Sequence, residues 1–184
     1  MVAVALAVER GRLTAGVRRV ERRRDESLED ALARAIDVGA LGHVEQLETR
    51  VLRDGALATA YLGLAREPIG DAAASADERE LVDAARGRLR AKLSYTNAGF
   101  ALAPDTFTIS ELREVYVAAL GHDVSATNLQ RVLLRRGVLK RLDGRREPGR
   151  AGGRPAALFQ FASRRLEITD EFAALRPPGS RASG

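Results

Sequence analysis

Start and stop signals for two short helices, between residues 108 and 137, restrict the fold of this chain more than any other feature. The segment Thr108-Ile109-Ser110-Glu111 is a capping box that begins the first helix, and Gly121 ends it. Ser125 is the expected N-cap of the second helix, which ends at Gly137. Two short helices joined by a turn that contains glycine form the helix-turn-helix pattern. Any two packed helices can resemble it, so its interpretation depends on the surrounding residues.

The second helix is expected to expose a polar and cationic face. Thr127, Arg131 and Arg135 recur at four-residue steps, with Asn128 beside them. Arg and Asn side chains make two-point hydrogen bonds to guanine and adenine edges in duplex DNA. A solvated helix face is the alternative, and the lack of an acidic residue three or four positions away argues against it. The candidate DNA contacts on this helix are Thr127, Asn128, Arg131, Arg135 and Arg136.

A basic hairpin follows this helix directly. Strands are expected over residues 138–142 and 156–161, with a turn at Asp143-Gly144 and a long tip. Such a hairpin after a helix-turn-helix is typical of a wing, and a flexible solvated loop is the alternative. In Gly153-Arg154-Pro155 the slim backbone would fit the minor groove, whose negative potential attracts arginine. The candidate DNA contacts in the hairpin are Lys140, Arg145, Arg146, Arg150 and Arg154.

Positive charge is concentrated in the same region. Residues 125–165 contain eleven Lys or Arg against only Asp143 and Glu147, a net charge of +9, whereas residues 1–76 carry −1. A partner made of phosphates explains this segregation most simply. No aromatic residue occurs in the basic region before Phe159, which disfavours the base stacking of single-strand binders. Double-stranded DNA is the expected partner, and a winged helix that binds RNA or a protein is the alternative.

The N-terminal part reads as a mixture of strands and one short helix. Alternating large and small apolar residues predict a strand over 2–8 whose small face lies close to another element, followed by a strand over 13–20. Helical spacing of apolar residues predicts a helix over 27–38, with Asp25 or Ser27 as its N-cap and Gly39 as its stop. Two further strands, over 44–51 and 56–65, are expected to join through a hairpin at Arg53-Asp54-Gly55.

A long helix is expected after the loop over residues 68–76. Asp77 and Glu80 have the spacing of a capping box, and an apolar stripe recurs at four-residue steps. The stripe consists of Leu81, Ala85, Leu89 and Leu93. We interpret this helix as a connector. Its stripe is equally compatible with packing inside its own subunit and with packing on a second copy.

Composition and motif spacing exclude several other classes of protein. The chain has no cysteine, so disulfides, thiolate metal sites and a cysteine nucleophile are excluded. Neither of the two histidines, His43 and His122, has a carboxylate at metal-ligand spacing, and no metal site is expected. The apolar run Val2 to Val8 is too short to span a membrane and lacks the flanks of a signal peptide. The sequence thus predicts a cytoplasmic protein with no membrane partner.

Three motifs, in order and with matching spacing, resemble the C-terminal domain of the Nudix-related transcriptional regulators. They are Phe107-Thr108-Ile109-Ser110-Glu111-Leu112-Arg113-Glu114-Val115-Tyr116, then Gly137-Val138-Leu139, and Gly153-Arg154-Pro155-Ala156-Ala157-Leu158-Phe159-Gln160-Phe161. Upstream, His43-Val44-Glu45-Gln46-Leu47 and Ala60-Tyr61-Leu62 look like core strands of that family's Nudix domain. The segment Leu89-Arg90-Ala91-Lys92-Leu93-Ser94-Tyr95-Thr96 looks like its connecting helix.

The resemblance implies an α+β protein in which a degenerate Nudix-like α/β sandwich is followed by a winged helix-turn-helix domain. The implied boundaries are a shortened Nudix-like domain over 1–70, a linker and connecting helix over 71–100, the DNA-binding domain over 101–165 and a C-terminal tail over 166–184. Members of the family are repressors of NAD-metabolism genes that sense ADP-ribose or a related nucleotide and act as dimers. The resemblance thus implies duplex DNA, an ADP-ribose-like effector and a second copy as partners.

The chain departs from the Nudix signature where that signature binds metal. Arg34 falls on the arginine of the signature, but Ala35 stands where a metal-binding Glu should follow, and Val38-Gly39 replace a pair of Glu. The preceding loop, Glu21-Arg22-Arg23-Arg24, lacks the expected glycines. Those carboxylates would hold Mg²⁺ against a diphosphate, so we expect no catalytic residue, no metal and no cofactor. A divergent Nudix hydrolase is the alternative, and a hydrolysis assay would separate the two.

Overall fold

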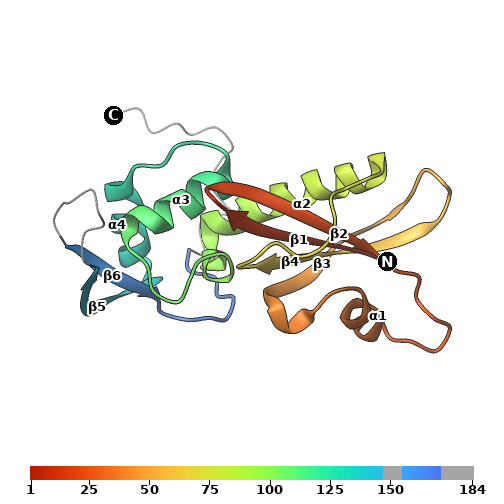
Figure 1. Cartoon of the computed structure of the whole chain (residues 1–184), viewed down its shortest axis with the longest axis horizontal. Helices are drawn as coiled ribbons and strands as arrows, with labels where there is room; N and C mark the ends of the chain where they lie inside the picture. Colours follow the sequence, from red (N-terminus) through yellow and green to blue (C-terminus); the bar gives the residue numbers. More distant parts are fainter. Residues whose placement is uncertain (147–154, 171–184) are drawn as a thin grey trace.

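The computed structural model describes residues 1–146 and 155–170, which form an N-terminal sheet covered by helices and a C-terminal winged helix (Figure 1). The N-terminal elements are β1 (Val2–Glu9), β2 (Arg12–Arg19), α1 (Leu28–Ala35), the 3-10 helix η1 (Val38–Ala40), β3 (Leu41–Val51) and β4 (Leu57–Ala65). They are followed by α2 (Ala76–Tyr95), the 3-10 helix η2 (Ala98–Ala101), α3 (Ile109–Leu120), α4 (Ala126–Arg135), β5 (Leu139–Arg146) and β6 (Ala156–Phe161). This arrangement confirms the predicted α+β class.

The N-terminal sheet has the strand order β2-β1-β4-β3, with β1 parallel to β4 and the other neighbours antiparallel. The central strand β1 is buried on both faces. Val2, Val4 and Leu6 lie in the core that α2 covers, whereas Ala3 and Ala5 pack against α1. The small side chains let α1 approach closely, as the alternation of large and small residues predicted. The sheet is therefore the middle layer of an α/β sandwich (Figure 1).

Helix α1 begins where it was predicted but ends earlier. The Ser27 side chain accepts a hydrogen bond from the Asp30 backbone N–H at 3.0 Å, as an N-cap does. The expected continuation to Val38 is wrong, because Ile36 adopts an extended backbone (φ −146°, ψ 146°) and buries its side chain. Asp37 then accepts a hydrogen bond from Gly39 N–H and caps the separate turn η1.

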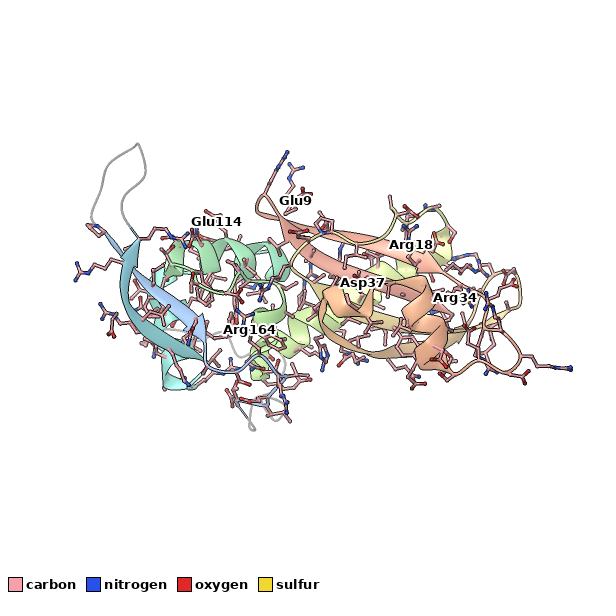
Figure 2. All side chains as sticks on the ribbon, turned by 60° about the horizontal axis from the view of Figure 1, so that its bottom comes forward. Glu9, Arg18, Arg34, Asp37, Glu114 and Arg164 are labelled. Atoms are coloured by element: carbon pink, nitrogen blue, oxygen red, sulfur yellow. The ribbon has the colours of Figure 1, made fainter. Side chains whose placement is uncertain are left out.

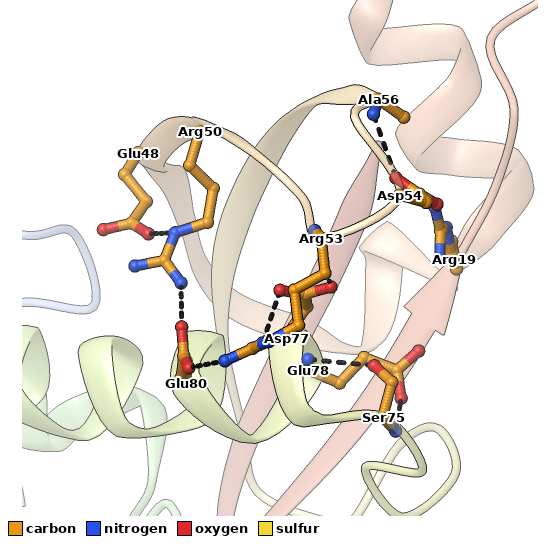
Figure 3. A network of polar contacts seen from close by, with 10 residues as sticks. All are labelled: Arg19, Glu48, Arg50, Arg53, Asp54, Ala56, Ser75, Asp77, Glu78 and Glu80. Atoms are coloured by element: carbon orange, nitrogen blue, oxygen red, sulfur yellow. Dashed lines mark hydrogen bonds and ion pairs between the residues drawn. The ribbon is translucent and has the colours of Figure 1, made fainter.

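Helix α2 is capped by Ser75 and Glu78, two residues earlier than the expected pair Asp77 and Glu80. Asp77 and Glu80 instead pair with Arg53 of the β3–β4 hairpin (Figure 3), with Asp77 Oδ1 2.7 Å from Arg53 Nη1. The stripe of Leu81, Ala85, Leu89 and Leu93 is at most 4% exposed and covers the sheet. Of the two arrangements that the sequence left open, the structure selects packing inside the subunit.

The winged helix is built on aromatic residues that join its first segment to its last. Phe107 and Phe159 exchange backbone hydrogen bonds of 3.0 and 2.8 Å, and the Phe107 and Phe161 rings meet edge to face at 5.4 Å. The expected turn at Asp143-Gly144 is wrong, because β5 continues to Arg146 with only an irregular register after Arg141. The hairpin at Arg53-Asp54-Gly55 is confirmed, with Gly55 at φ +82°.

No helix in the described part of the chain is long and apolar enough to cross a membrane.

Candidate nucleic-acid interface

Local contacts, most of them predictable from the sequence, hold the turn between α3 and α4. Thr108 and Glu111 form the capping box at the start of α3, and Gly121 ends the helix in the left-handed region at φ +77°. Arg113 Nε then donates a hydrogen bond to the Val124 carbonyl at 2.7 Å, and its guanidinium pairs with Asp123. These contacts set the angle at which α4 leaves α3, and they confirm the predicted helix pair.

Helix α4 separates apolar and polar residues onto opposite faces. Leu129 and Leu133 are buried, whereas Thr127, Asn128, Arg131 and Arg135 are exposed, as predicted. Arg131 Nη2 donates to Asn128 Oδ1 at 2.6 Å, so these two side chains present their remaining donors together. Within residues 1–146 and 155–170, neither Arg131 nor Arg135 pairs with a carboxylate. This face can therefore accept a polyanion without breaking an internal ion pair.

The two strands after α4 carry further exposed cations. Lys140, Arg141 and Arg145 are exposed on β5, whereas Arg146 pairs with Glu111 of the α3 capping box. Arg141 had not been singled out from the sequence. It lines a small hollow between α3, α4 and the hairpin together with Ser110 and Gln130. Leu139 at the start of β5 is buried in the core, whereas both Lys140 and Arg141 are exposed. The expected contacts Arg150 and Arg154 lie outside the described residues.

Arg136 was also expected among the DNA contacts, and in the structure its guanidinium makes hydrogen bonds within the protein. Its guanidinium turns away from the α4 face and donates to the Thr96 carbonyl at 2.9 Å and to Thr169 Oγ1 at 3.0 Å. The Thr169 N–H in turn donates to the Tyr95 carbonyl at 2.8 Å. Arg136 thus fixes the end of α4 to the end of α2. A cation is favourable there, because the last carbonyls of a helix carry partial negative charge.

In the N-terminal domain, Arg34, which was compared above with the arginine of the Nudix signature, forms an ion pair with Glu26. Arg34 Nε and Nη2 donate to the two carboxylate oxygens of Glu26, each at 2.9 Å, and Nη2 also donates to the Glu21 carbonyl at 2.8 Å. These bonds from Arg34, together with one from the Arg23 backbone, lower the pKa of Glu26 to about 2. Figure 2 shows Arg34 with Asp37 at this end of the molecule. The ion pair between Glu26 and Arg34 therefore joins the loop that precedes α1 to the helix.

His43 lies beside a carboxylate after all. Its Nε2 is 3.0 Å from Glu45 Oε2, and Lys92 Nζ reaches the same oxygen at 2.7 Å. Burial alone would raise the pKa of Glu45, but the hydrogen bonds from Lys92 and His43 hold it below its usual value. The signal in the sequence was the His-x-Glu spacing in a strand, which puts both side chains on one face. Because Lys92 pairs with the Glu45 carboxylate, the cluster joins β3 to α2. The described residues contain no group of three side chains that could hold a metal ion.

The C-terminal part is similar to known DNA-binding proteins. Residues 99–161 match the family model described as the NrtR DNA-binding winged helix domain. The ADPR responsive transcriptional repressor NtrR of Acinetobacter baylyi is 35% identical over 86 residues, which cover 47% of this chain and 33% of that protein. The match thus spans only about a third of that relative's length.

The fold of most of the chain is shared with a solved protein. The crystal structure of Shewanella oneidensis NrtR complexed with a 27mer DNA has a TM-score of 0.65 and 23% identity, covering 86% of this chain and 91% of that chain. A second crystal structure of Shewanella oneidensis NrtR has a TM-score of 0.62 and 22% identity, with the same coverage. The likeness includes both the N-terminal sheet and the winged helix, and it confirms the predicted architecture.

Proposed function

We propose that this protein is a DNA-binding transcriptional regulator, acting as a repressor, whose winged helix contacts double-stranded DNA. The observation that carries the proposal is the match of residues 99–161 to the NrtR DNA-binding winged helix domain. The exposed face of α4 supports it, because Arg131 and Arg135 have no carboxylate partner in the described structure.

The geometry supports a division of labour between base and phosphate contacts. Helix α4 would enter the major groove, where Asn128 and Arg131 present donors and acceptors that match base edges. Arg135, Lys140 and Arg145 lie further along the same exposed surface and would contact phosphates. The wing would approach the adjacent minor groove. Arg136 is not among these proposed DNA contacts, because its guanidinium donates a hydrogen bond to the Thr96 carbonyl at the end of α2.

The proposal also includes a Nudix-like N-terminal domain without hydrolytic activity. Ala35, Val38 and Gly39 offer no side-chain oxygen to a metal ion, and the carboxylate of Glu26 already accepts two hydrogen bonds from Arg34. We expect no turnover of ADP-ribose or of dinucleotide diphosphates with Mg²⁺ or Mn²⁺. Turnover that Glu26→Gln abolishes would favour the competing hydrolase function.

An effector and a second copy complete the proposal. The Acinetobacter baylyi relative is named as ADPR responsive, and we extend to this chain a response to an ADP-ribose-like nucleotide. A symmetric dimer would read two half-sites of a palindromic operator. Sedimentation of the protein alone and on its operator measures the stoichiometry.

The decisive experiment is selection of bound fragments from the source organism's own genomic DNA by the purified full chain. We expect enrichment of a small set of sites that share one motif. The double variant Arg131→Ala/Arg135→Ala should lose this enrichment. As a matched control, Arg23→Ala/Arg24→Ala removes two cations from the loop before α1 and should retain it. Equal recovery of all fragments, or tighter binding of a structured RNA, would contradict the proposal.

A further inference from the structure

A small hollow of about 210 Å³ lies where the start of α3, the middle of α4 and the hairpin β5–β6 meet. Ser110 lines it from α3, Gln130 from α4 and Arg141 from β5, and Figure 1 shows these elements packed together at one end of the molecule. Pockets for drug-sized ligands run from about 300 Å³ upwards, so this hollow is too small to enclose such a molecule. It has room for a single small group such as a phosphate.

The polar side chains that line the hollow are hydrogen-bond donors without a partner. Within residues 1–146 and 155–170, the side chains of Ser110, Gln130 and Arg141 make no hydrogen bond and no ion pair. A guanidinium has five N–H donors, a side-chain amide two and a hydroxyl one. The other lining residues are Thr108, Ile109, Ala156, Ala157 and Phe159. Among the described residues no acidic side chain lines the hollow, so it offers an anion one positive charge and several donors.

Backbone hydrogen bonds hold the walls of the hollow together. Phe107, just before the cap of α3, and Phe159 of β6 exchange backbone hydrogen bonds of 3.0 and 2.8 Å. Phe159 is also the register partner of Arg141 on β5. Three segments of the chain thus lie side by side, and the start of α3 stays close to the strand that carries Arg141. The backbone of the hollow is therefore in place before a ligand binds, which lowers the entropic cost of binding.

Glu111, the residue after Ser110, is engaged with other partners. Its Oε2 accepts hydrogen bonds from the Thr108 N–H at 2.7 Å and from Thr108 Oγ1 at 3.1 Å. Its Oε1 pairs with Arg146. The charge of this carboxylate is thus balanced by Arg146, and the guanidinium of Arg141 stays available to an external anion.

The hollow borders the face of α4 that is proposed to read bases. Gln130 follows Thr127 by three residues, and residues three apart are neighbours on the surface of a helix. Thr127 and Asn128 belong to the exposed polar face of α4. In a helix-turn-helix bound to DNA the second helix lies in the major groove, while the first crosses the backbone. A hollow between the start of α3 and the flank of α4 would therefore face the backbone beside that groove.

We propose that the hollow binds one phosphate of the DNA backbone, which accepts hydrogen bonds from Arg141, Gln130 and Ser110. The proposal rests on the proposed DNA-binding function and adds a contact to it. A phosphodiester carries one negative charge, which a single arginine balances, and its two free oxygens suit the two-point geometry of a guanidinium. Phosphate contacts fix the register of a protein on the duplex. This phosphate would thus set the position at which α4 enters the major groove.

The test replaces the phosphates of a selected binding site one at a time by neutral methylphosphonates and measures the affinity of the full chain by fluorescence anisotropy. We expect a linkage whose replacement weakens the wild type about tenfold or more but does not weaken Arg141→Ala further, because both changes remove the same contact. Gln130→Ala should be less sensitive than the wild type at that same linkage.

Unmodified DNA gives a second set of expected results. Arg141→Ala should lower the affinity about tenfold or more and reduce the salt slope by about 1. Gln130→Ala should lower it about three- to tenfold at an unchanged slope, because no charge is removed. Gln130→Glu should bind more weakly than Gln130→Ala, because its carboxylate would face the phosphate. Each variant should weaken the selected site and its single-base-pair variants by the same factor.

Two controls separate this contact from a general loss of charge. Arg24→Ala removes an exposed cation from the loop before α1 and should leave the affinity and every methylphosphonate effect unchanged. Lys140→Ala removes the neighbouring cation on β5 and should couple to a different linkage. Circular dichroism identifies any variant that fails to fold. Arg141→Lys, which keeps the charge without the two-point geometry, then replaces Arg141→Ala.

Coupling of Arg141 and Gln130 to different linkages would overturn the proposal, as would Gln130→Glu binding as tightly as the wild type. Inorganic phosphate might displace DNA at constant ionic strength from the wild type and not from Arg141→Ala. With no coupled linkage, that result would assign the hollow to a free anion and also overturn the proposal. If the wild type binds a selected site without a coupled linkage, only this contact is refuted. If it binds no DNA, the proposed function is refuted as well.

Discussion

Arginines are frequent in both halves of this protein, but their surroundings differ. In the N-terminal domain Arg19, Arg34 and Arg53 are each paired with a carboxylate of the same domain or of α2. On α4 and β5 the exposed cations Arg131, Arg135, Lys140, Arg141 and Arg145 have no such partner in the part of the chain that the structure describes. Arginine content alone therefore does not identify a polyanion-binding surface.

The difference has a physical consequence for function. A phosphate that approaches a paired arginine must compete with a carboxylate already in contact, whereas an unpaired arginine exchanges only water and counterions. Surface ion pairs such as Arg19–Asp54 contribute little stability each, but they neutralise the surface around them. Residues 1–76 carry a net charge of −1 and residues 125–165 one of +9, so the N-terminal domain presents an almost neutral surface to DNA and the winged helix a cationic one.

The salt dependence of DNA binding is the largest expected effect and tests the comparison as a whole. If the unpaired cations contact phosphates, the log–log slope of affinity against salt should be roughly −4 to −8. Affinity should then fall about 10²- to 10⁵-fold between 50 and 200 mM salt, as measured by fluorescence anisotropy. The N-terminal variant Arg23→Ala/Arg24→Ala should give the wild-type slope. A flat salt response would show that the cationic surface does not bind DNA.

Two adjacent arginines sharpen the comparison within one helix. Arg136→Ala should lower the free energy of unfolding by roughly 1.5–3 kcal/mol, because hydrogen bonds from a charged group to Thr96 and Thr169 are lost. It should leave the salt slope unchanged. Arg135→Ala should do the reverse, reducing the slope by about 1 with little change in stability. Urea denaturation and anisotropy titrations measure both, and a reduced slope in Arg136→Ala would place that side chain on DNA.

Arg131→Ala tests whether the unpaired face reads bases as well as phosphates. Loss of a two-point base contact should cost about 1–3 kcal/mol on the preferred site and relax the choice of base at one position. The measurement compares the selected site with sites changed one base pair at a time. Equal weakening on every sequence would make Arg131 a phosphate contact.

The smallest effect is expected at the paired arginine of the N-terminal domain. The pKa of Glu26 is lowered to about 2 in the folded state, so its ionised form stabilises the fold at neutral pH. Glu26→Gln should therefore be less stable than wild type above about pH 5, and this difference should shrink as the pH falls from 4.5 towards 2. DNA affinity at neutral pH should not change. A stability difference independent of pH would contradict the assigned role of the Arg34–Glu26 pair.

Much of the winged helix follows from residues that are close together in the sequence. The caps at Thr108 and Ser125 and the left-handed glycines Gly121 and Gly137 act within one helical turn, so their spacing alone places α3 and α4. The alternation of residues along β1 likewise predicted a strand with one small face. These signals succeed because the hydrogen bonds and packing that they report are local.

Other features needed the folded chain, because they join residues that are far apart in the sequence. Arg136 and Arg135 are neighbours, but only the position of Thr96 and Thr169 turns Arg136 inward. Asp77 was expected to cap α2, but its carboxylate pairs with Arg53. Ser75 caps the helix instead.

The sequence by itself determined the helix pair, the basic hairpin and the concentration of charge in residues 125–165. Only the tertiary structure decided which cations have carboxylate partners, and that Arg66 and Arg164 share the carboxylate of Asp105. The physical reason is the distance along the sequence between the residues that interact. Capping and periodicity are set within a few residues, whereas an ion pair depends on where the fold brings two distant segments together.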